Sequence, residues 1–271
     1  MKYAIIFLFG LFMVYGCTEK KDNNMNKEPD IVTKQITYSA DGTTLKGFLT
    51  YDSSQTGKRP GIIVVHEWWG LNQYARHRAE MLAKLGYIAF AVDMYGNGTV
   101  ADHPKEAGKF AMAVMQKMDT ARARFDAGLR LLREQPQTDP SKIAAIGYCF
   151  GGGIVLRMAL GGTDLNGVVS FHGDLPTDSI TNPKDVKARM LICNGAADPL
   201  NPPDKIEAFE KKMNSANLNY KLINYPGAKH SFTNPAADSI GNKYNLPLAY
   251  NKQADEKSWE TMKNFFDEIF R

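Results

Sequence analysis

A cysteine stands at the centre of a short motif whose glycine spacing is typical of a catalytic turn. The hexapeptide Gly147-Tyr148-Cys149-Phe150-Gly151-Gly152 lies between two apolar runs, which predicts a strand, a sharp turn and a helix. Glycine two residues to either side of the cysteine lets neighbouring backbones approach without a Cβ clash. The thiol would project from the turn, and the amide of Phe150 would face a developing oxyanion. The alternative is a buried cysteine in an ordinary strand-to-helix turn.

Two further polar residues could complete a thiol-based site. Asp198 follows a predicted strand at 190–194, and His230 follows a predicted strand at 220–225. Side chains at the carboxyl ends of parallel strands gather at one edge of a sheet. Asp198 could instead only shape an Asp-Pro turn, and His230 could be a solvated loop residue. The order of nucleophile, acid and base, each after a strand, favours a catalytic triad.

The chemistry of these residue types suggests their roles. His230 would take the thiol proton and later protonate the leaving group, and Asp198 would orient the imidazole and stabilise its cation. The backbone amide of Trp68 is the candidate for the second half of the oxyanion hole. Glu67, beside it, is unexpected because a carboxylate opposes negative charge that develops nearby. Without a role of its own, Glu67 should face solvent or pair with an arginine such as Arg76.

The segments that must hold these residues alternate between strand and helix. An alternating pattern at 35–52, with Asp41-Gly42 as its turn, predicts an antiparallel hairpin. The strands that follow are apolar on both faces, which indicates a mostly parallel sheet with helices on both faces, an α/β fold. We expect these strands at 61–66, 87–95, 143–146, 168–171, 190–194 and 220–225, and helices at 73–85, 105–118, 120–135, 203–217 and 249–270, besides one after Cys149.

Composition bounds the partners of the chain. With 271 residues, 44% of them hydrophobic, the chain can bury a large core in one domain. The net charge of +4 is small and its charges are interspersed, which disfavours nucleic acid as a partner. Histidine, cysteine and carboxylate residues show no metal-ligand spacing, and no glycine-rich phosphate loop is present. We expect neither a metal nor a cofactor.

The N-terminus has the composition of an export signal. After Lys2 an uncharged apolar run leads to Val14-Tyr15-Gly16-Cys17, too short for a membrane span and suited to a signal peptide. It resembles a bacterial lipoprotein signal, with 1–16 removed, Cys17 lipidated, 17–32 a flexible tether and 33–271 the folded domain. Plain secretion or an uncleaved anchor is the alternative. We expect an exported, membrane-anchored bacterial lipoprotein that is monomeric.

The remaining cysteine reads as a core residue. Cys193 lies in the apolar strand expected at 190–194, and the strand expected at 168–171 separates it in sequence from Cys149. If that strand also lies between them in the sheet, the two cysteines are two strands apart, about 9–10 Å. That separation is too large for a disulfide. The sequence therefore predicts that these two thiols stay unpaired.

Taken together, these segments resemble the dienelactone hydrolase (carboxymethylenebutenolidase) family of the α/β-hydrolase fold, over about residues 33–271. The likeness rests on His66-Glu67-Trp68-Trp69-Gly70, Asp93-Met94-Tyr95-Gly96, the Cys149 hexapeptide, Asp198-Pro199 and Tyr225-Pro226-Gly227-Ala228-Lys229-His230-Ser231-Phe232. The resemblance implies a triad of Cys149, His230 and Asp198, and hydrolysis of an enol lactone without a cofactor. It also implies that Glu67 holds and activates the thiol until substrate displaces it.

The chain departs from this family at two positions that bind substrate. Well-studied members clamp the substrate carboxylate with two arginines, where this chain has Asn97 and Asn234. Asparagine does not replace a two-point arginine clamp. We therefore expect Asn97 and Asn234 at the substrate, but not a dienelactone carboxylate as the native ligand. An arginine from elsewhere, such as Arg76 or Arg124, would restore carboxylate binding.

Aromatic residues around the motifs predict an apolar mouth for the site. Trp68, Trp69, Phe150 and Phe232 are the candidates, although aromatic residues more often belong to the core. His172 ends a predicted strand near the site and could contact substrate or be structural. The favoured function is hydrolysis of a small activated ester or lactone through a thioester acyl-enzyme. The alternatives are a non-catalytic binding lipoprotein that keeps the fold and, less favoured, a thiol redox sensor.

Overall fold

The computed structural model describes Met1 and residues 28–178, 180 and 182–271. Most of the predicted signal peptide, Cys17 and most of the tether lie outside the described residues. The first strand begins at Ile31, so the folded domain starts slightly before the predicted residue 33. Within the described ranges, no helix is both long and apolar enough to cross a membrane.

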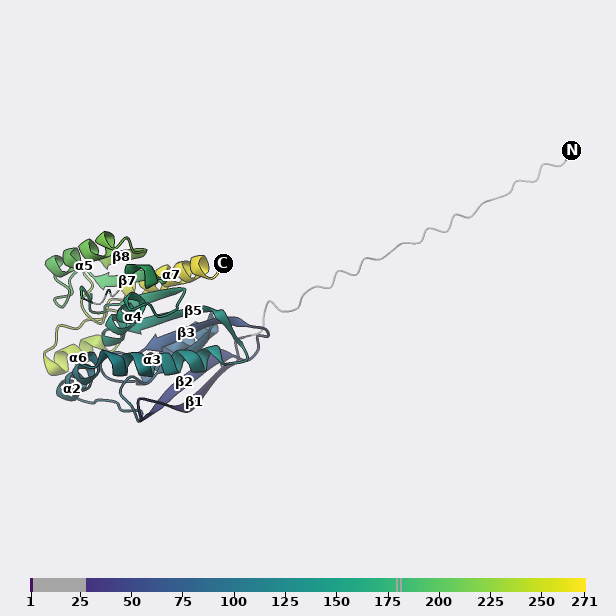
Figure 1. Cartoon of the computed structure of the whole chain (residues 1–271), viewed down its shortest axis with the longest axis horizontal. Coiled ribbons are helices and arrows are strands. Elements are labelled where there is room, and N and C mark those ends of the chain that lie inside the picture. The colour runs from purple at the N-terminus through teal and green to yellow at the C-terminus, as the bar shows by residue number, and fades with distance from the viewer. Residues whose placement is uncertain (2–27, 179, 181) are drawn as a thin grey trace.

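One mostly parallel sheet forms the centre of the domain (Figure 1). Its spatial order is β1-β2-β4-β3-β5-β6-β7-β8. The strands are β1 (Ile31–Ala40), β2 (Thr43–Asp52), β3 (Arg59–Val65), β4 (Ile88–Val92), β5 (Thr138–Tyr148), β6 (Gly167–Phe171), β7 (Arg189–Gly195) and β8 (Tyr220–Tyr225). The β1–β2 hairpin is antiparallel, as predicted, and β2 also pairs antiparallel with β4. From β4 to β8 every pairing is parallel, which confirms the predicted α/β architecture.

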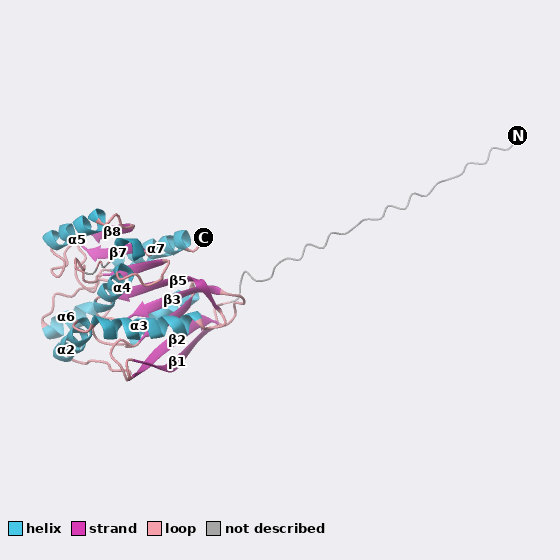
Figure 2. Cartoon of the chain, viewed as in Figure 1, coloured by secondary structure: helices cyan, strands magenta, loops and turns pink. Residues whose placement is uncertain are grey.

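Helices cover both faces of this sheet (Figure 2). They are α1 (Gln73–Lys84), α2 (Pro104–Met115), α3 (Met118–Arg133), α4 (Phe150–Leu160), α5 (Pro203–Ser215), α6 (Ala237–Tyr244) and α7 (Lys252–Ile269), with a short 3-10 turn at Pro183–Asp185. The helical break predicted near Asp119 falls slightly earlier, between α2 and α3. Helix α6 was not expected from the sequence: its N-cap, Ala236, makes no side-chain capping bond, so the usual start signal is missing.

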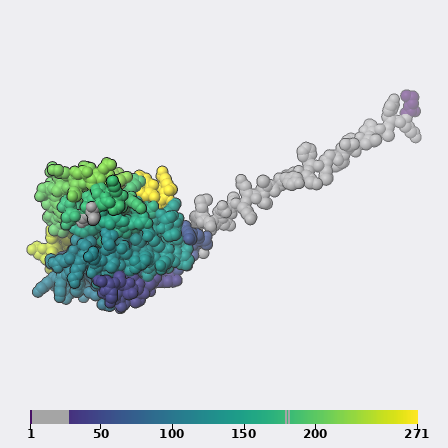
Figure 3. Space-filling model, in the orientation of Figure 1, coloured from purple at the N-terminus to yellow at the C-terminus, as the bar shows by residue number. Residues whose placement is uncertain are grey.

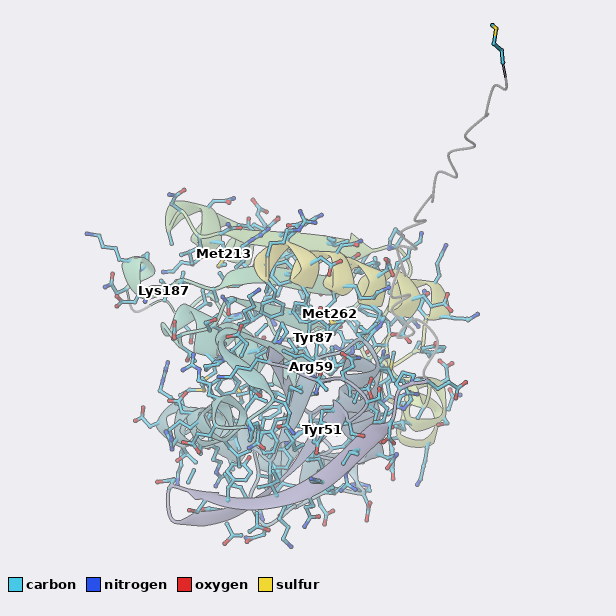
Figure 4. The ribbon with its side chains drawn as sticks, turned by 90° about the vertical axis from the view of Figure 1, so that its right-hand side faces the viewer. Tyr51, Arg59, Tyr87, Lys187, Met213 and Met262 are labelled. Carbon is cyan, nitrogen blue, oxygen red and sulfur yellow. The ribbon has the colours of Figure 1, made fainter. Side chains whose placement is uncertain are left out.

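Alternation along the central strands builds two separate cores. Ile63 and Val65 of β3 pack into the cluster that includes α3, α4 and α5, whereas Ile62 and Val64 pack into the cluster that includes α1 and α7. Successive side chains of a strand point to opposite faces, so a strand covered on both faces must be apolar throughout. Tyr87 and Met262, labelled in Figure 4, belong to the second cluster. Figure 3 shows the surface of the rounded body that encloses these clusters.

The order of the strands also decides the fate of the two described cysteines. Strand β6 lies between β5, which leads to Cys149, and β7, which contains Cys193. Both thiols are free, which confirms the prediction that they do not pair. Cys193 is fully buried, and burial raises the pKa of its thiol to about 12. It is a core residue.

The carboxyl ends of the parallel strands meet at one edge of the sheet. In Figure 1 their arrowheads point to the side of the molecule where α2 and α6 lie. The loops that carry Glu67, Cys149, His172, Asp198 and His230 follow β3, β5, β6, β7 and β8 in that order. Open α/β sheets hold their ligands at this edge. The fold therefore brings these five residues to the same edge of the sheet.

Candidate active site

The cysteine turn between β5 and α4 requires its glycines. A Cβ on Gly147 would collide with the backbone of Gly151, and a Cβ on Gly151 would collide with the carbonyl oxygen of Val65 in β3. Cys149 at the apex has a φ of 53°, a left-handed conformation that side chains rarely adopt. Such strain persists where the surroundings enforce it and is common at active sites. The motif thus holds a half-buried thiol at the start of α4.

His230 lies within hydrogen-bond distance of both other residues of the predicted triad, Cys149 and Asp198. His230 Nε2 lies 3.1 Å from Cys149 Sγ, and His230 Nδ1 lies 2.8 Å from Asp198 Oδ2. His230 and Asp198 are 5% and 3% exposed, so bulk water hardly reaches the imidazole and the carboxylate. This geometry suits proton transfer between thiol and imidazole, with the carboxylate fixing the ring.

The surroundings of His230 favour its charged form. Burial alone lowers the pKa of a histidine, but the negative charge of Cys149 and the hydrogen bonds with Asp198 and Cys149 outweigh it. Together they raise the pKa of His230 to about 10. The arrangement can therefore hold a thiolate beside an imidazolium.

The turn that carries Asp198 is also a structural turn. Asp198 Oδ1 accepts the amide N–H of Leu200 at 2.9 Å, while Oδ2 faces His230. The two interpretations of the Asp-Pro sequence are thus compatible. One oxygen shapes the loop, and the same loop holds the other oxygen against the imidazole.

His172 forms a hydrogen bond with the backbone of the cysteine turn. Its Nδ1 accepts the backbone N–H of Cys149 at 3.1 Å, and this N–H also bonds the carbonyl oxygen of Phe171 at 3.0 Å. Since Nδ1 is an acceptor, the proton of the neutral ring is on Nε2, which donates to Thr233 Oγ1 at 2.7 Å. His172 is fully buried and contacts the backbone of the nucleophile. Of the two roles considered for it, this contact is structural.

A buried polar network extends from His172 to a charged pair. Thr233 Oγ1 lies 2.6 Å from the hydroxyl of Tyr74, and the carbonyl oxygen of Thr233 accepts from Arg78. Arg78 also pairs with Asp255 at 2.7 Å. Burial, followed by the positive charges of His230 and Arg78, lowers the pKa of His172 well below its usual value. His172 therefore stays neutral.

The loop after β4 supports the second candidate for the oxyanion hole. Asp93 accepts backbone N–H groups of Tyr95 and Gly96 at 2.9 and 2.8 Å, which fixes the turn. The hydroxyl of Tyr95 then donates to the carbonyl oxygen of Trp68 at 2.8 Å, which holds the peptide that follows the candidate amide. Phe150 opens α4, and amides of a first helical turn have no acceptor within the helix. The oxyanion roles of Phe150 and Trp68 stay predictions.

Glu67 is buried rather than solvent-facing. It is 2% exposed and accepts hydrogen bonds from Ser231 Oγ at 3.1 Å and Asn234 Nδ2 at 2.7 Å. Burial raises the pKa of Glu67, although both hydrogen bonds and the charge of His230 lower it. Arg76 does not pair with it but stacks over the ring of Phe48. Both simple expectations for Glu67 were therefore wrong.

A cleft of about 350 Å³ opens at the thiol. Cys149, His230, Trp68 and Phe150 are among its walls, as their predicted roles require. The other wall residues were missed by sequence reasoning: Ala111, Asp174, Leu200, Asn201 and Lys205. They come from three distant segments, and no motif marks them. Within the described residues, no group of three or more histidine, cysteine or acidic side chains could hold a metal ion.

Five residues predicted to bind substrate are not wall residues of this cleft. Trp69 packs with Ala101 and Ala107, Phe232 is fully buried in the second core cluster, and His172 lies beneath the thiol. Asn234 is buried and donates to Glu67. Asn97 is exposed, and its backbone N–H bonds Thr44 at 2.7 Å. Aromatic residues next to a motif more often fill a core than face a ligand.

Known proteins resemble this chain over nearly the whole domain. Residues 45–270 match the dienelactone hydrolase family. Protein usf of Aquifex pyrophilus is 28% identical over 231 residues, which cover 81% of this chain and 98% of that protein. A provisionally named carboxymethylenebutenolidase of Aquifex aeolicus is 25% identical over 238 residues, 86% of this chain and 97% of its own.

Solved structures share the fold. A dienelactone hydrolase-like promiscuous phosphotriesterase from metagenomic libraries is 33% identical, with a TM-score of 0.83 over 88% of this chain and 98% of its own. A thermophilic esterase of Thermogutta terrifontis is 20% identical, with a TM-score of 0.61 over 88% of this chain and 92% of its own. The latter likeness extends to the architecture alone.

Proposed function

The chain belongs to the dienelactone hydrolase family of ester and lactone hydrolases, and we propose that it works through Cys149, His230 and Asp198. The observation that carries this proposal is the pair of contacts made by His230, 2.8 Å to Asp198 Oδ2 and 3.1 Å to the Cys149 sulfur. The contact lies in a cleft large enough for a small ester. Hydrolysis here needs a nucleophile, a proton carrier and an oxyanion site.

The reaction proceeds in two halves. The Cys149 thiolate attacks the carbonyl carbon, and the oxyanion is stabilised by the amides of Phe150 and Trp68. The C–O bond breaks, protonated His230 delivers its proton to the departing oxygen, and a thioester remains on Cys149. His230 then takes a proton from water, whose oxygen attacks the thioester. The thiolate leaves with the acid as product, and His230 again carries the proton.

The walls of the cleft support a small and largely apolar substrate. Trp68, Phe150, Leu200 and Ala111 surround the thiol. Lys205, at the same wall, is already paired with Asp174 at 2.6 Å, so its charge is compensated. Activated oxygen esters and lactones suit this site better than amides, because their leaving group needs less protonation. The family's lactone chemistry is one such case.

Glu67 serves as a reserve partner for the thiol in this proposal. The family resemblance gives the glutamate the task of holding the thiol until substrate displaces it. In the described conformation Ser231 and Asn234 hold Glu67, while His230 holds Cys149. This conformation corresponds to the state in which the thiol has already turned to the histidine. Replacement of Asn234 by alanine would then favour the state with Glu67 at the thiol.

We also propose that the enzyme is exported and anchored to the membrane through a lipid on Cys17. The apolar run before Cys17 and the polar stretch after it support this location. Globomycin treatment or Cys17→Ala should leave the unprocessed precursor, which is larger by the signal peptide. If Cys17→Ala migrates and partitions with membranes like the wild type, the anchor is not a lipid on this residue.

The central test replaces Cys149 with alanine. We expect turnover of an aryl acetate to fall by roughly a thousandfold or more, because the nucleophile is lost. The matched control is Cys193→Ala, which removes the buried thiol of β7 and should keep turnover. In the wild type, rapid quenching during turnover should reveal an acetyl group on the peptide that contains Cys149. Undiminished turnover by Cys149→Ala would refute the proposal.

A broad substrate panel separates this enzyme from a binding protein that only keeps the fold. The panel includes aryl esters, lactones and an aryl phosphotriester, because the similar structure at 33% identity is a promiscuous phosphotriesterase. If the wild type turns over none of them and iodoacetamide leaves Cys149 unmodified, the non-catalytic alternative holds.

A further inference from the structure

A second hollow lies near the cleft and has Tyr95 in its wall. Its volume is about 360 Å³, and its walls come from α2, α3, the segment between these helices, the β1–β2 turn and the loop after β4. Tyr95 is one of these walls, and its hydroxyl supports Trp68, which is a wall of the catalytic cleft. The two hollows are therefore neighbours that share one supporting residue.

The second hollow contains positive charge without a carboxylate partner. Lys117 and Arg124 line it, and neither forms an ion pair within the described part of the chain. Asp41, the acidic residue of these walls, accepts a hydrogen bond from Thr120 at 3.0 Å. The guanidinium of Arg124 donates through Nη1 to the carbonyl oxygen of Met94 at 2.7 Å. This leaves the hollow with an excess of one positive charge.

One donor of Arg124 lacks an acceptor. Its Nε is buried, and among the described residues it has no hydrogen-bond partner. A buried donor without an acceptor costs free energy, so such groups are usually paired with protein, water or ligand. That Nε is closed to the hollow and Nη1 is bonded to Met94, so the nitrogen of Arg124 open to a carboxylate is Nη2, which makes no hydrogen bond within the described residues. A guanidinium N–H binds a carboxylate through a charge-assisted hydrogen bond.

In the catalytic cleft, by contrast, the cation is already paired with a carboxylate. Its cation Lys205 pairs with Asp174 at 2.6 Å, and Arg157 pairs with the same carboxylate at 2.6 Å. An anion that enters the cleft must compete with Asp174, whereas an anion in the second hollow meets charges that are not paired. The position of the charges therefore favours the second hollow for an anion.

We propose that the second hollow binds a small carboxylic acid anion with an apolar body. The carboxylate pairs with Arg124, with Lys117 at the rim, and the body packs against Phe110, Val114 and Tyr95. The volume lies within the usual range for small-molecule sites. The proposal rests on the walls and charges of this hollow and not on the reactivity of Cys149. The acid released by the proposed hydrolysis belongs to the same chemical class.

The test measures binding of benzoate and of its neutral analogue benzamide to the full-length chain. Iodoacetamide first modifies Cys149, which fills the cleft and leaves the second hollow open. Titration calorimetry or ligand-observed NMR should show saturable benzoate binding at one site. Benzamide should bind at least about tenfold more weakly, which corresponds to about 1.4 kcal/mol. Equal affinities, or no saturable benzoate binding, would overturn the proposal.

Variants locate the site. Ala113 is an exposed wall residue of the hollow on α2, so Ala113→Phe fills the space without entering the core, and benzoate binding should be lost. Lys117→Gln should weaken binding by roughly two- to fivefold, as expected for an exposed charge. Lys205→Gln is the matched control in the cleft and should leave benzoate affinity unchanged. Benzoate binding that survives Ala113→Phe would place the anion elsewhere and refute the site.

The outcome does not depend on the proposed catalysis. If Cys149 resists iodoacetamide, the titrations are performed on the unmodified chain, and Ala113→Phe and Lys205→Gln still distinguish the two hollows. Loss of turnover without loss of benzoate binding would refute the triad alone. A wild type that turns over substrate normally but does not bind benzoate would refute the carboxylate site alone.

Discussion

Two histidines contact Cys149, and their pKa values are shifted in opposite directions. The rings of His172 and His230 lie 5.4 Å apart, edge to face, and both are buried. The pKa of His230 is raised to about 10, and that of His172 is lowered well below its usual value. Burial acts on both in the same direction, so burial does not explain the difference.

The partners of each ring explain it. His230 lies between the carboxylate of Asp198 and the sulfur of Cys149, both of which favour a cation. His172 faces an amide N–H and a hydroxyl, with Arg78 close enough to oppose a second cation. A histidine that carries protons and a histidine that holds a backbone thus differ in the charge of their neighbours. The four predictions that follow test this difference, from the largest expected effect to the smallest.

The first prediction concerns Asp198, the carboxylate partner of His230 in the proposed triad. Asp198→Asn keeps the size of the side chain but removes its charge and favours the wrong tautomer of His230. We expect the turnover number for an aryl acetate to fall on the order of ten-thousandfold, as for the same change in a serine triad. Steady-state kinetics and circular dichroism at neutral pH check activity and fold together. A loss below about tenfold would show that Asp198 does not orient the base.

Loss of His172 Nδ1, the acceptor of the Cys149 amide, should reduce turnover less than the change at Asp198. His172→Phe removes the bond to the Cys149 amide, and we expect the turnover number to fall by roughly ten- to a hundredfold as the thiol loses its position. His172→Asn offers an acceptor near Nδ1 and tolerates the positive φ of 41° at this position. Asparagine should therefore restore most of the activity.

If His172 serves only the stability of the fold and does not position the thiol, the pattern is different. In that case both variants would lose stability in proportion to activity, and neither would change the pH profile of turnover. Thermal unfolding and pH profiles of the two variants, measured side by side, decide between these outcomes.

Acidification should lower the stability of the fold through its buried neutral histidines, His66 and His172. A histidine whose pKa is lower in the folded state binds its proton mainly after unfolding, so stability is full above about pH 6.5 and falls as the pH falls. Burial lowers the pKa of His66 to about 4 and lowers that of His172 well below its usual value. His66 alone should cost roughly 3 kcal/mol of stability by the time the pH falls below 4.

Urea unfolding at several pH values between 7 and 4.5 tests this expectation. His172→Asn lacks one of the two groups, so its stability should decline less steeply than that of the wild type over this range. Parallel curves for the two proteins would mean that His172 is not buried in its neutral form.

The smallest effect is expected at the hydroxyl that accepts from His172. Thr233→Ser keeps this hydroxyl and should change turnover less than about twofold. Thr233→Val removes it and leaves His172 Nε2 and Tyr74 without their shared partner, which should cost about 1–3 kcal/mol of stability. Chemical denaturation of the pair measures the difference. Equal stability of the serine and valine variants would contradict the network.

The motif residues could be placed from the sequence because each follows a strand. Apolar runs at the expected positions became β3, β5, β7 and β8, so the ends of these strands predicted where Cys149, Asp198 and His230 would meet. The walls of the cleft could not be predicted in this way. Leu200 comes from the loop after β7, Lys205 from the start of α5 and Ala111 from α2, and their approach to the thiol depends on how these segments pack.

Neighbouring positions in the sequence also separated in space. Asn97 was expected at the substrate, but Gly96 and Gly98 on either side have positive φ, and the turn directs Asn97 away from the cleft. Arg124 was considered as a replacement cation for the cleft. It lines the second hollow instead, together with Tyr95. Local patterns carry no information about such directions.

By itself the sequence determined the α/β architecture, the turn that carries Cys149, and the order of the partners of Cys149 along the chain. These follow from strand periodicity and glycine spacing, which act over a few residues. Only the tertiary structure decided which histidine is charged, where Glu67 points and which cations are left unpaired. Proton affinity and charge compensation depend on burial and on partners such as Asp198, Arg78 and Asp174, which reach their sites from distant parts of the chain.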